Sequence, residues 1–424
     1  MAERSLAERD QAVIWHPYTQ MQDALSPVPI VRGEGPYLFD EDGKKYLDAV
    51  SSWWVNIHGH AHPYIAEKVA QQLRTLEHVI FAGFTHPAAV ELAEQLLKII
   101  PGNQSRVFYS DNGSTAVEVA LKMCFQYWKN IGQSRTRVLA FQNSYHGDTF
   151  GAMSVSSRSE FTKPFEQLLF DVEFIDTPNK QNIGRLKEQL SALSSKLSAF
   201  IFEPLVQGAG GMIMHDAQFL DELLSHCKKE SILTIADEVM TGFGRTGKLF
   251  ASDHLKTQPD VMCFSKGLTG GTMALGVTTC ISKIYEGFLS EDKLKTFFHG
   301  HSFTANPIAC SAALASMDIL LRPETMQSII RISDKHRLFA QKITQHPKVR
   351  THRQTGTIFA IEWETGDNTS YFNRLRDDLY NFFLKEGVIL RPLGNIIYIM
   401  PPYCITDDQL DYIYMKIEEA LERF

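Results

Sequence analysis

Two stretches, Ile232-Leu-Thr-Ile-Ala-Asp237 and Val261-Met-Cys-Phe-Ser-Lys266, each run from a short apolar segment into one charged residue. Apolar runs of this length between turn residues are typical of buried strands in an α/β sheet. Ligands of open α/β sheets bind beyond the carboxyl ends of the strands. We therefore expect Asp237 and Lys266 to face a ligand at the same edge of one sheet.

An acid and an amine at one sheet edge suit a cofactor that needs one anion and one covalent amine. Pyridoxal 5'-phosphate (PLP) has these needs, because a lysine forms its Schiff base and an acid holds its pyridine nitrogen protonated. The sequence therefore predicts PLP as the cofactor, with Lys266 as the covalent residue and Asp237 as the acid.

The region from about 60 to 310 alternates strand-like runs with segments of helical periodicity. This alternation predicts an α/β fold with a mostly parallel sheet covered by helices on both faces. The strands expected with most support are Val107–Tyr109, Val138–Phe141, Ala199–Phe202, Ile232–Ala236 and Val261–Phe264.

Both ends of the chain differ from this central region. Tyr37–Phe39 and Lys45–Leu47 flank an acidic turn and predict a hairpin. After about 310 a long helical stretch is followed by mixed α and β patterns. We expect an N-terminal arm (1–55) packed with a small C-terminal domain (311–424), and a large domain (56–310) between them in sequence.

A helix is expected after Asp111-Asn-Gly-Ser114, any of whose three polar side chains could cap it. Its apolar face is predicted to hold Val117, Ala120, Leu121, Cys124, Phe125 and Trp128. Gly113 and Ser114 would present free backbone N–H groups at the positive end of the helix dipole. Such a helix start suits a phosphate group, although most capped helix starts bind nothing.

Composition indicates a large globular protein without a nucleic-acid or membrane partner. The 424 residues are 44% hydrophobic and 21% charged, with a net charge of −7 and no basic tract. The first twelve residues lack the apolar core of a secretory signal, and no run approaches the length of a membrane span. The six cysteines are scattered without CxxC spacing, so buried reduced thiols and a cytoplasmic location are expected.

Two weaker motifs point to other chemistry. Gly242–Lys248 matches both GxGxxG and GxxxxGK, but Leu249 stands where a P-loop needs Ser or Thr, and no long helix follows. We therefore expect a loop there, with a nicotinamide-dependent dehydrogenase as the distant alternative. His58, His60 and His62 lack a further ligand at metal-site spacing, so we expect no metal and place them on a loop or the wall of a cleft.

Several motifs together resemble class III aminotransferases, which are PLP enzymes of fold type I. The lysine-site signature is carried by Asp237, Gly242–Gly247, Ser265-Lys266-Gly267 and Gly270-Gly271. The resemblance spans nearly the whole chain and narrows to the members that make 7,8-diaminononanoate in biotin synthesis. The narrowing segments are Trp15–Thr19, Ser51–Trp54, Ser144–Thr149, Val206–Met212, Arg391–Gly394 and Tyr398–Pro402.

The resemblance assigns roles around the cofactor. Lys266 carries PLP and later moves the proton between the substrate Cα and C4′ of the cofactor. Asp237 pairs with the pyridinium nitrogen, Tyr145 stacks on the ring, and Gly113 and Ser114 hold the phosphate. Glu203 is expected near O3′, with a structural acid as the alternative. Gly300, His301 and Ser302 reach the active site of the other subunit, where Ser302 contacts the phosphate, so a homodimer is implied.

The resemblance also implies a substrate wall formed by Tyr18, Trp53 and Trp54. If this segment is an extended strand, adjacent side chains point to opposite faces. We therefore favour Trp53 as the direct contact, and leave Trp54 between a ligand contact and a core residue. Arg391 is expected to pair with a substrate carboxylate.

The implied reaction proceeds in two half-reactions through one pocket. S-adenosylmethionine gives its amino group to PLP, and the aminated cofactor then converts 8-amino-7-oxononanoate to 7,8-diaminononanoate. Gly300-His-Ser-Phe303 departs from the Gly-Pro-Thr-Phe of S-adenosylmethionine users and resembles relatives that use lysine. Tyr18, Trp53-Trp54 and Thr272–Leu275 favour S-adenosylmethionine. Lysine as donor, another class III ω-aminotransferase and a PLP-fold protein without catalysis remain alternatives.

Overall fold

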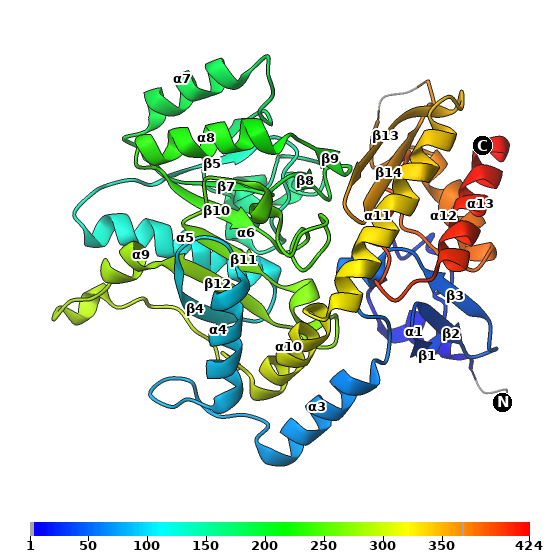
Figure 1. Ribbon diagram of the computed structural model, residues 1–424, viewed down its shortest axis with the longest axis horizontal. Coiled ribbons are helices and arrows are strands. Elements are labelled where there is room, and N and C mark those ends of the chain that lie inside the picture. Colours follow the sequence, from blue (N-terminus) through cyan, green and yellow to red (C-terminus); the bar gives the residue numbers. More distant parts are fainter. Residues whose placement is uncertain (1–3, 367–368) are drawn as a thin grey trace.

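The computed structural model describes residues 4–366 and 369–424. Its centre is a seven-stranded sheet whose strands stand in the order β4-β12-β11-β10-β7-β5-β6 (Figure 1). In chain order these strands are β4 (Gln104–Ser110), β5 (Arg137–Phe141), β6 (Val172–Ile175), β7 (Leu197–Phe202), β10 (Leu233–Asp237), β11 (Val261–Phe264) and β12 (Gly276–Ile281). The strands expected from the sequence are confirmed.

The sheet is mostly parallel, as expected, but one strand is reversed. β10 pairs in parallel with β7 and β11, and β5 with β6 and β7. β12 runs antiparallel to both of its neighbours, β11 and β4. The connection between β11 and β12, residues 265–275, brings the chain back along β11 without a crossover helix, whereas a parallel neighbour would need a longer crossover.

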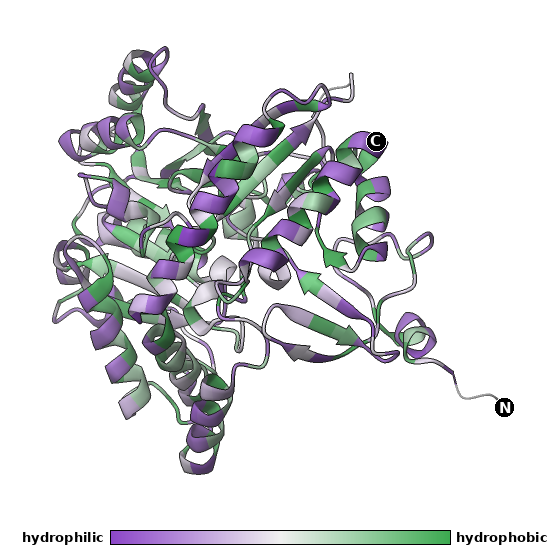
Figure 2. Ribbon diagram, turned by 45° about the vertical axis from the view of Figure 1, so that its right-hand side comes forward, coloured by the Kyte–Doolittle hydropathy of each residue, from purple (hydrophilic) through white to green (hydrophobic). Residues whose placement is uncertain are grey.

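Helices cover both faces of this sheet, which explains why its inner strands β5, β7, β10 and β11 are mostly apolar. On one face α5 (Gly113–Asn130) packs with Val138, Ala140 and other strand residues. On the other face Leu139 and Phe141 join a larger core with α4 (Pro87–Ile99), α7 (Ile183–Leu193) and α8 (Ala217–Lys229). Figure 2 shows the hydrophobic strands inside and helices whose outer turns are hydrophilic.

The remaining elements of this region connect the sheet to its surroundings. They are α2 (Ser51–Trp54), α3 (Pro63–Thr75), α6 (Phe150–Val155), α9 (Ser282–Glu286), α10 (Pro307–Leu320), the short hairpin of β8 (Val206–Gln207) and β9 (Ile213–Met214), and the 3₁₀ turns η1 (Lys163–Leu168), η2 (Ala251–His254), η3 (Lys266–Thr269) and η4 (Lys293–Lys295).

Two smaller sheets lie beside the main one, and Figure 1 shows them together with the C-terminal helices. One has the order β1-β2-β3-β15 and the other the order β13-β14-β16. Their elements are α1 (Leu6–Val13), β1 (Ile30–Glu34), β2 (Tyr37–Asp40), β3 (Lys45–Asp48), α11 (Pro323–Ile343), β13 (Val349–Thr355), β14 (Ile358–Trp363), α12 (Leu375–Lys385), β15 (Val388–Ile389), β16 (Ile396–Ile399) and α13 (Asp407–Arg423).

The first sheet joins the two ends of the chain. The predicted hairpin is confirmed, because β2 and β3 pair antiparallel across the Asp40–Gly43 turn. β3 then pairs in parallel with β15, with Leu47 opposite Val388. The N-terminal arm is therefore hydrogen-bonded to the C-terminal region.

The cysteines are all free, but they are not all buried as expected. Cys124, Cys227, Cys263, Cys280 and Cys310 are buried, whereas Cys404 is exposed. Cys404 belongs to the turn between β16 and α13, which lies at the surface of the small sheets. No helix within the described residues is both long and apolar enough to cross a membrane.

Candidate active site

A cavity of about 680 Å³ lies at the carboxyl ends of β10 and β11, beside the first turn of α5. Seven of the residues expected from the sequence line it: Trp54, Gly113, Ser114, Tyr145, Glu203, Asp237 and Lys266. Tyr18, Trp53, Gly300, His301, Ser302 and Arg391 do not belong to its lining. The structure therefore brings together the cofactor residues expected from this subunit. It leaves Tyr18, Trp53, Arg391 and the 300–302 loop, which was expected to serve the other subunit, outside the lining of this cavity.

Lys266 begins the turn η3, two residues after β11 ends. Its φ of 46° is positive, a conformation that costs a residue with a side chain about 1–3 kcal/mol. Burial lowers the pKa of its amine, although Asp237 and Glu203 oppose that shift. The Nζ atom lies 5.0 Å from the centroid of the Trp54 ring. An amine with a lowered pKa is more readily neutral, which both covalent bonding and proton transfer require.

Asp237 is the last residue of β10 and is only 5% exposed. One carboxylate oxygen lies 2.7 Å from Nδ1 of the buried His146, and the other accepts from the Val239 N–H at 3.1 Å. The Nε2 atom of His146 is buried without a partner within the described residues. His146 therefore fixes the orientation of the acid at the floor of the cavity.

The first turn of α5 presents backbone hydrogen-bond donors to the cavity. Asn112 caps the helix by accepting from the Thr115 N–H at 3.0 Å. The N–H groups of Gly113 and Ser114 make no hydrogen bond within the described residues, and both residues line the cavity. A Cβ atom at position 113 would lie 2.6 Å from Val239 Cγ1, so only glycine fits there. This arrangement can hold an anion such as a phosphate.

Glu203 is buried and bonded to backbone. One of its oxygens accepts from the Tyr145 N–H at 3.0 Å and the other from the Gly208 N–H at 2.9 Å. Burial raises the pKa of its carboxyl to about 7, against the opposing effect of His146. Glu203 therefore fastens the backbone of Tyr145 to the wall of the cavity.

Two tyrosines share one acid at the rim of the cavity. The hydroxyl of Tyr145 donates to Asp148 at 3.0 Å, and the hydroxyl of Tyr18 donates to the same Asp148 oxygen. Burial raises the pKa of Tyr18 to about 12 and raises the pKa of Tyr145 as well. Both phenols are therefore protonated at neutral pH, and Asp148 holds Tyr18 next to the cavity.

The paired tryptophans do not lie on an extended strand, which was the condition under which Trp53 was favoured over Trp54. Residues 51–54 have φ values of 51°, 45°, 69° and 76° and form a left-handed turn rather than a strand. Trp54 is 5% exposed and lines the cavity, and its Nε1 donates to Tyr398 at 3.0 Å. Trp53 is 38% exposed and lies at the rim. Trp54 thus has a more direct approach to this cavity than Trp53.

Arg391 lies at the same rim, two residues after β15. Its guanidinium carbon is 4.2 Å from the centroid of the Trp53 ring. Trp53 in turn contacts the edge of Tyr18, with ring centroids 5.7 Å apart. Tyr18, Trp53 and Arg391 therefore form one aromatic and cationic group outside the 680 Å³ cavity, suited to an anionic or cationic organic ligand that extends beyond it.

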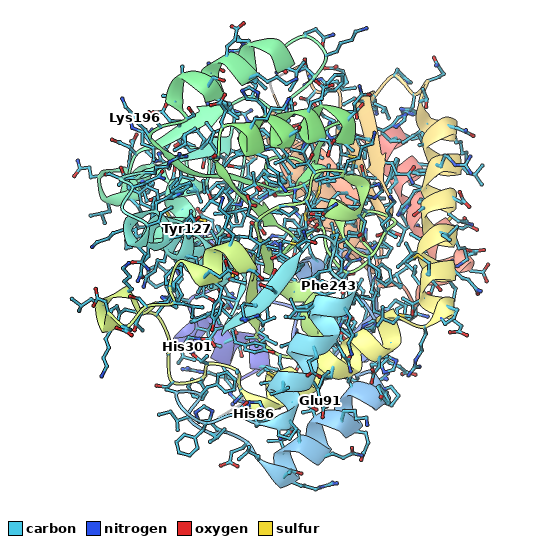
Figure 3. All side chains as sticks on the ribbon, turned by 60° about the vertical axis from the view of Figure 1, so that its left-hand side comes forward. His86, Glu91, Tyr127, Lys196, Phe243 and His301 are labelled. Carbon is cyan, nitrogen blue, oxygen red and sulfur yellow. The ribbon has the colours of Figure 1, made fainter. Side chains whose placement is uncertain are left out.

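Gly300, His301 and Ser302 belong to a loop before α10, and His301 is labelled in Figure 3. His301 Nε2 lies 3.5 Å from Asp111 Oδ1, and Asp111 lines the cavity. Ser302 has no contact with the cavity of its own chain.

The glycine-rich segment at 242–247 is a buried loop, as expected. The side chain of Arg245 donates to Pro401 O at 2.8 Å and to Trp54 O at 3.4 Å. Arg245 of this loop therefore holds the backbone carbonyl of Trp54, a residue that lines the cavity. Of the three histidines, His60 pairs with Asp48 at 2.9 Å, and His58 bonds to Ser316 at 3.0 Å.

Sequence reasoning missed several residues of the cavity. His146, Asp148 and Thr149 all lie in the quoted Ser144–Thr149 motif, yet only Tyr145 was singled out. Thr149 donates to Glu118 on α5 at 2.5 Å, and its N–H donates to Ser114 Oγ at 3.0 Å. These polar residues follow the buried strand β5 closely in sequence. Such a run predicts side chains at the carboxyl edge of the sheet, and this pattern could have identified them as site residues.

The family model of class III aminotransferases matches residues 18–421 of this chain. The chain therefore belongs to the class III aminotransferase family. This agrees with the resemblance found in the motifs and with the mixed α/β fold.

Curated relatives and solved structures cover almost the whole chain. It is 48% identical to the adenosylmethionine-8-amino-7-oxononanoate aminotransferase of Synechococcus elongatus, over 96% of this chain and 98% of the relative. It is 39% identical to the enzyme of the same name from Geobacter sulfurreducens, over 99% and 97%. The crystal structure of that aminotransferase from Methanocaldococcus jannaschii has a TM-score of 0.95, 35% identity and coverage of 99% and 98%. The omega transaminase from Pseudomonas jessenii in complex with PMP has a TM-score of 0.93 at 27% identity and covers 99% of this chain and 98% of that one.

Proposed function

We propose that this chain transfers an amino group from S-adenosylmethionine to 8-amino-7-oxononanoate, giving 7,8-diaminononanoate for biotin synthesis, with PLP as its cofactor. The observation that carries the proposal is that Asp237 and Lys266 line one cavity, in a chain that is 48% identical to a relative of that name. The nicotinamide-dependent alternative lacks support, because its glycine motif forms a buried structural loop and not the start of a helix.

The residues of the cavity fit the cofactor. Lys266 supplies the amine, and Asp237 supplies an anion for the pyridine nitrogen. The free N–H groups of Gly113 and Ser114 suit the phosphate. Tyr145 offers an aromatic face in the same cavity, and Glu203 is a candidate partner for the ring hydroxyl. When bound, PLP supplies an electron-withdrawing ring that stabilises negative charge at the substrate Cα.

The chain's own residues then bind, orient and move protons. The lowered pKa of Lys266 allows its neutral amine to take a proton from the substrate and return it. His146 keeps the carboxylate of Asp237 in place. Trp54 and Tyr145 supply aromatic surface to the same cavity, while Tyr18, Trp53 and Arg391 would receive the substrate chain and its carboxylate outside it.

Broad aromatic surfaces suit two substrates of different shape, because apolar contact demands little directional matching. The adenosyl group and the aliphatic chain of the oxononanoate would occupy the same wall in turn. Lysine remains a second candidate donor, because Gly300-His-Ser-Phe303 departs from the pattern of S-adenosylmethionine users.

A single-turnover experiment distinguishes the donors. The PLP-loaded protein is mixed with S-adenosylmethionine or with lysine, and the loss of the visible absorbance of the lysine-bound cofactor is followed. We expect S-adenosylmethionine to drive the loss, and 8-amino-7-oxononanoate to restore the absorbance. Conversion by lysine alone would contradict the assigned donor. Conversion by ornithine or 4-aminobutyrate alone would replace the reaction with that of another class III ω-aminotransferase.

The assembly and location of the protein are part of the proposal. We infer a homodimer in which Gly300, His301 and Ser302 complete the partner's site; the exposed Phe298 and Phe303 beside them support an interface there. We infer a cytoplasmic location, which the free cysteines favour. We divide the chain into an arm (1–55), a large PLP-binding domain (56–310) and a small domain (311–424). Light scattering of the purified protein tests the dimer, and a monomer with full activity would contradict it.

A further inference from the structure

The turn that carries Lys266 has a left-handed residue at each end. Lys266 has a φ of 46° and Gly270 a φ of 61°. A glycine adopts this conformation readily, but a lysine does so only where the surrounding structure holds it there. Contacts that hold this turn therefore determine where the lysine amine points.

A buried serine and a buried histidine reach this turn from outside the cavity. The carbonyl of Gly267, the residue after the lysine, accepts from the Gly270 N–H at 3.0 Å and from Ser316 Oγ at 3.2 Å. Ser316 lies on α10 and is 1% exposed. Its Oγ lies 3.0 Å from Nε2 of His58, which is 5% exposed. Neither Ser316 nor His58 lines the cavity.

The protons of this relay can be assigned. Burial lowers the pKa of His58 to about 3, so its ring is neutral and carries one N–H. The serine hydroxyl has a single proton, and the carbonyl of Gly267 can only accept. Both contacts are satisfied when Ser316 donates to Gly267 and His58 Nε2–H donates to Ser316. The opposite tautomer would leave one of the two contacts without a proton.

His58 also packs against the far end of the turn. A Cβ atom at Gly270 would lie 2.9 Å from His58 Cδ2, so the ring rests directly on that glycine. The buried Phe243, labelled in Figure 3, closes the turn from another direction, because a Cβ at Gly267 would lie 3.1 Å from it. The histidine therefore contacts Gly270 directly and Gly267 through the serine.

We propose that His58 and Ser316 are positioning residues that hold the Lys266–Gly270 turn in the conformation that aims the lysine amine into the cavity. This gives a role to the first histidine of the His58-Gly-His60-Ala-His62 motif, which the proposed reaction does not use. The proposal rests on the proposed function in one respect: the position of the Lys266 amine is detected through its bond to PLP.

The test uses the PLP-loaded protein and two readouts that do not need turnover. The first is the pH midpoint of the visible absorbance of the lysine-bound cofactor, and the second is the rate at which PLP re-attaches after its removal. Asp237 and Glu203, the charged groups that act on Lys266, stay unchanged in all variants. For Ser316→Ala we expect a midpoint shift of at least about half a pH unit. We also expect re-attachment to slow about tenfold.

Matched variants distinguish a loss of the contacts that position the Lys266–Gly270 turn from a general loss of stability. Ser316→Thr keeps the hydroxyl, and His58→Gln keeps an N–H donor near the position of Nε2, so both should stay close to the wild-type midpoint. His62→Gln makes the same change in a neighbouring ring, 6.3 Å from His58 between centroids, and should leave both readouts unchanged. His58→Leu should behave like Ser316→Ala.

Wild-type values of both readouts in folded Ser316→Ala would overturn the proposal, even if its melting temperature fell. If Ser316→Ala does not fold, equal readouts for His58→Leu and His58→Gln would overturn it. A wild-type protein without any PLP absorbance would refute the proposed function instead. In that case a crystal structure of Ser316→Ala decides, because a positive φ retained at Lys266 contradicts the proposal.

Discussion

Two groups of charged side chains in this molecule carry opposite pKa shifts. In the cavity, burial raises the pKa of Glu203 to about 7 and lowers that of Lys266. In the small sheet, burial alone would raise the pKa of Glu362, but hydrogen bonds from Thr369 and Arg353 outweigh it and the pKa falls. The hydrogen bond from Arg350 lowers the pKa of the neighbouring Glu364 to about 2.

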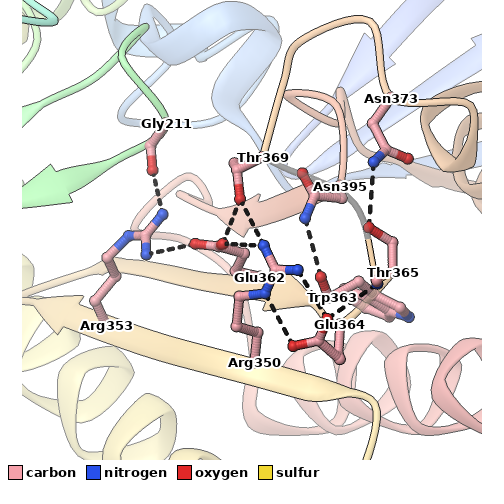
Figure 4. Close-up of polar contacts among 11 residues, drawn as sticks. Gly211, Arg350, Arg353, Glu362, Trp363, Glu364, Thr365, Thr369, Asn373 and Asn395 are labelled. Carbon is pink, nitrogen blue, oxygen red and sulfur yellow. Dashed lines mark hydrogen bonds and ion pairs between the residues drawn. The ribbon is translucent and has the colours of Figure 1, made fainter.

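The difference lies in the partners. Figure 4 shows Arg350 between Glu362 and Glu364, and Arg353 between Glu362 and the carbonyl of Gly211. These charges are neutralised within the chain. In the cavity, the carboxylates of Asp237 and Glu203 are bonded to His146 and to backbone N–H groups, but the amine of Lys266 makes no hydrogen bond or ion pair within the described residues. A site that prepares charges for a cofactor is therefore less stable on its own than a cluster that completes itself.

The largest expected effect is a loss of turnover on changing a residue of the cavity, which the small sheet should not show. Replacing Lys266 by Ala should lower turnover more than about a thousandfold, because the amine both bonds the cofactor and moves the proton. Steady-state kinetics with saturating PLP measures the loss. Lys248→Ala is the matched control, because Lys248 lies on the neighbouring loop and donates to Asp253 O, outside the cavity. Near-normal turnover in Lys266→Ala would refute the assignment of this lysine.

The next effect isolates the charge of the acid. Asp237→Asn can still accept from the Val239 N–H and still meet His146, but it cannot hold a proton on the pyridine nitrogen. We expect turnover to fall about a hundredfold, in line with the loss of one preorganised electrostatic contact. Asp216→Asn, a change at the N-cap of α8 outside the cavity, should have no such effect. Equal turnover in the two variants would show that the charge of Asp237 is not used.

In the small sheet the expected effect is on stability. Glu362→Gln should lower the free energy of unfolding by about 2 kcal/mol at pH 7, because it removes the carboxylate that pairs with Arg353 and also with Arg350, although Arg350 keeps its ion pair with Glu364. The lowered pKa of Glu362 means that its contribution exists above its unfolded pKa and is lost as pH falls through the folded value. The difference in urea midpoint should therefore shrink below about pH 4. A difference that is constant from pH 3 to 7 would contradict the ionic account.

In the cavity, removing a charged side chain should change the free energy of unfolding in the opposite direction. With the cofactor removed, Lys266→Met should raise the free energy of unfolding at pH 7, because it removes a buried amine whose pKa burial lowers. A base with a lowered folded pKa costs stability below that value, and the cost fades as pH rises to the unfolded pKa. The gain should therefore vanish near pH 10. A lower stability of Lys266→Met at pH 7 would mean that the amine is well accommodated without a ligand.

The smallest expected effect on stability comes from exposed ion pairs. They provide a reference for the buried charges of the cavity and of the small sheet. α11 and α13 are joined by three ion pairs with the same sequence offset: Arg331–Asp407, Lys335–Asp411 and Lys342–Glu418. Asp411 is 58% exposed at its side chain. Asp411→Asn should cost about 0.5 kcal/mol or less, and 1 M salt should abolish the difference. A salt-independent loss would assign the effect to packing.

Much of the fold could be predicted because burial leaves a direct trace in sequence. Strands covered on both faces must be apolar throughout, which is why Val138–Phe141 and Val261–Phe264 stood out. The reversed direction of β12 leaves no such trace, because a buried strand has the same composition whether it runs parallel or antiparallel. The left-handed turn at residues 51–54 was also hidden, since it places two tryptophans where glycine would be the usual residue.

In the site, the two charged residues that follow buried strands could be predicted from the sequence. The contacts between segments that are distant in the sequence could not. Asp237 and Lys266 follow directly from strand ends. The bonds of His58 to Ser316, 258 positions away, and of His146 to Asp237, 91 positions away, depend on how the elements pack. The rim formed by Tyr18, Trp53 and Arg391 likewise unites three segments through side-chain packing that composition does not encode.

The most direct test of the whole account is to locate the covalent bond to PLP. The purified protein is incubated with PLP, reduced with borohydride, digested and mapped by mass spectrometry. We expect the reduced cofactor on the peptide that contains Lys266, and on the same peptide in Asp237→Asn. A modification at any other lysine, or none in protein that has bound PLP, would contradict the placement of the amine and the acid around one cofactor.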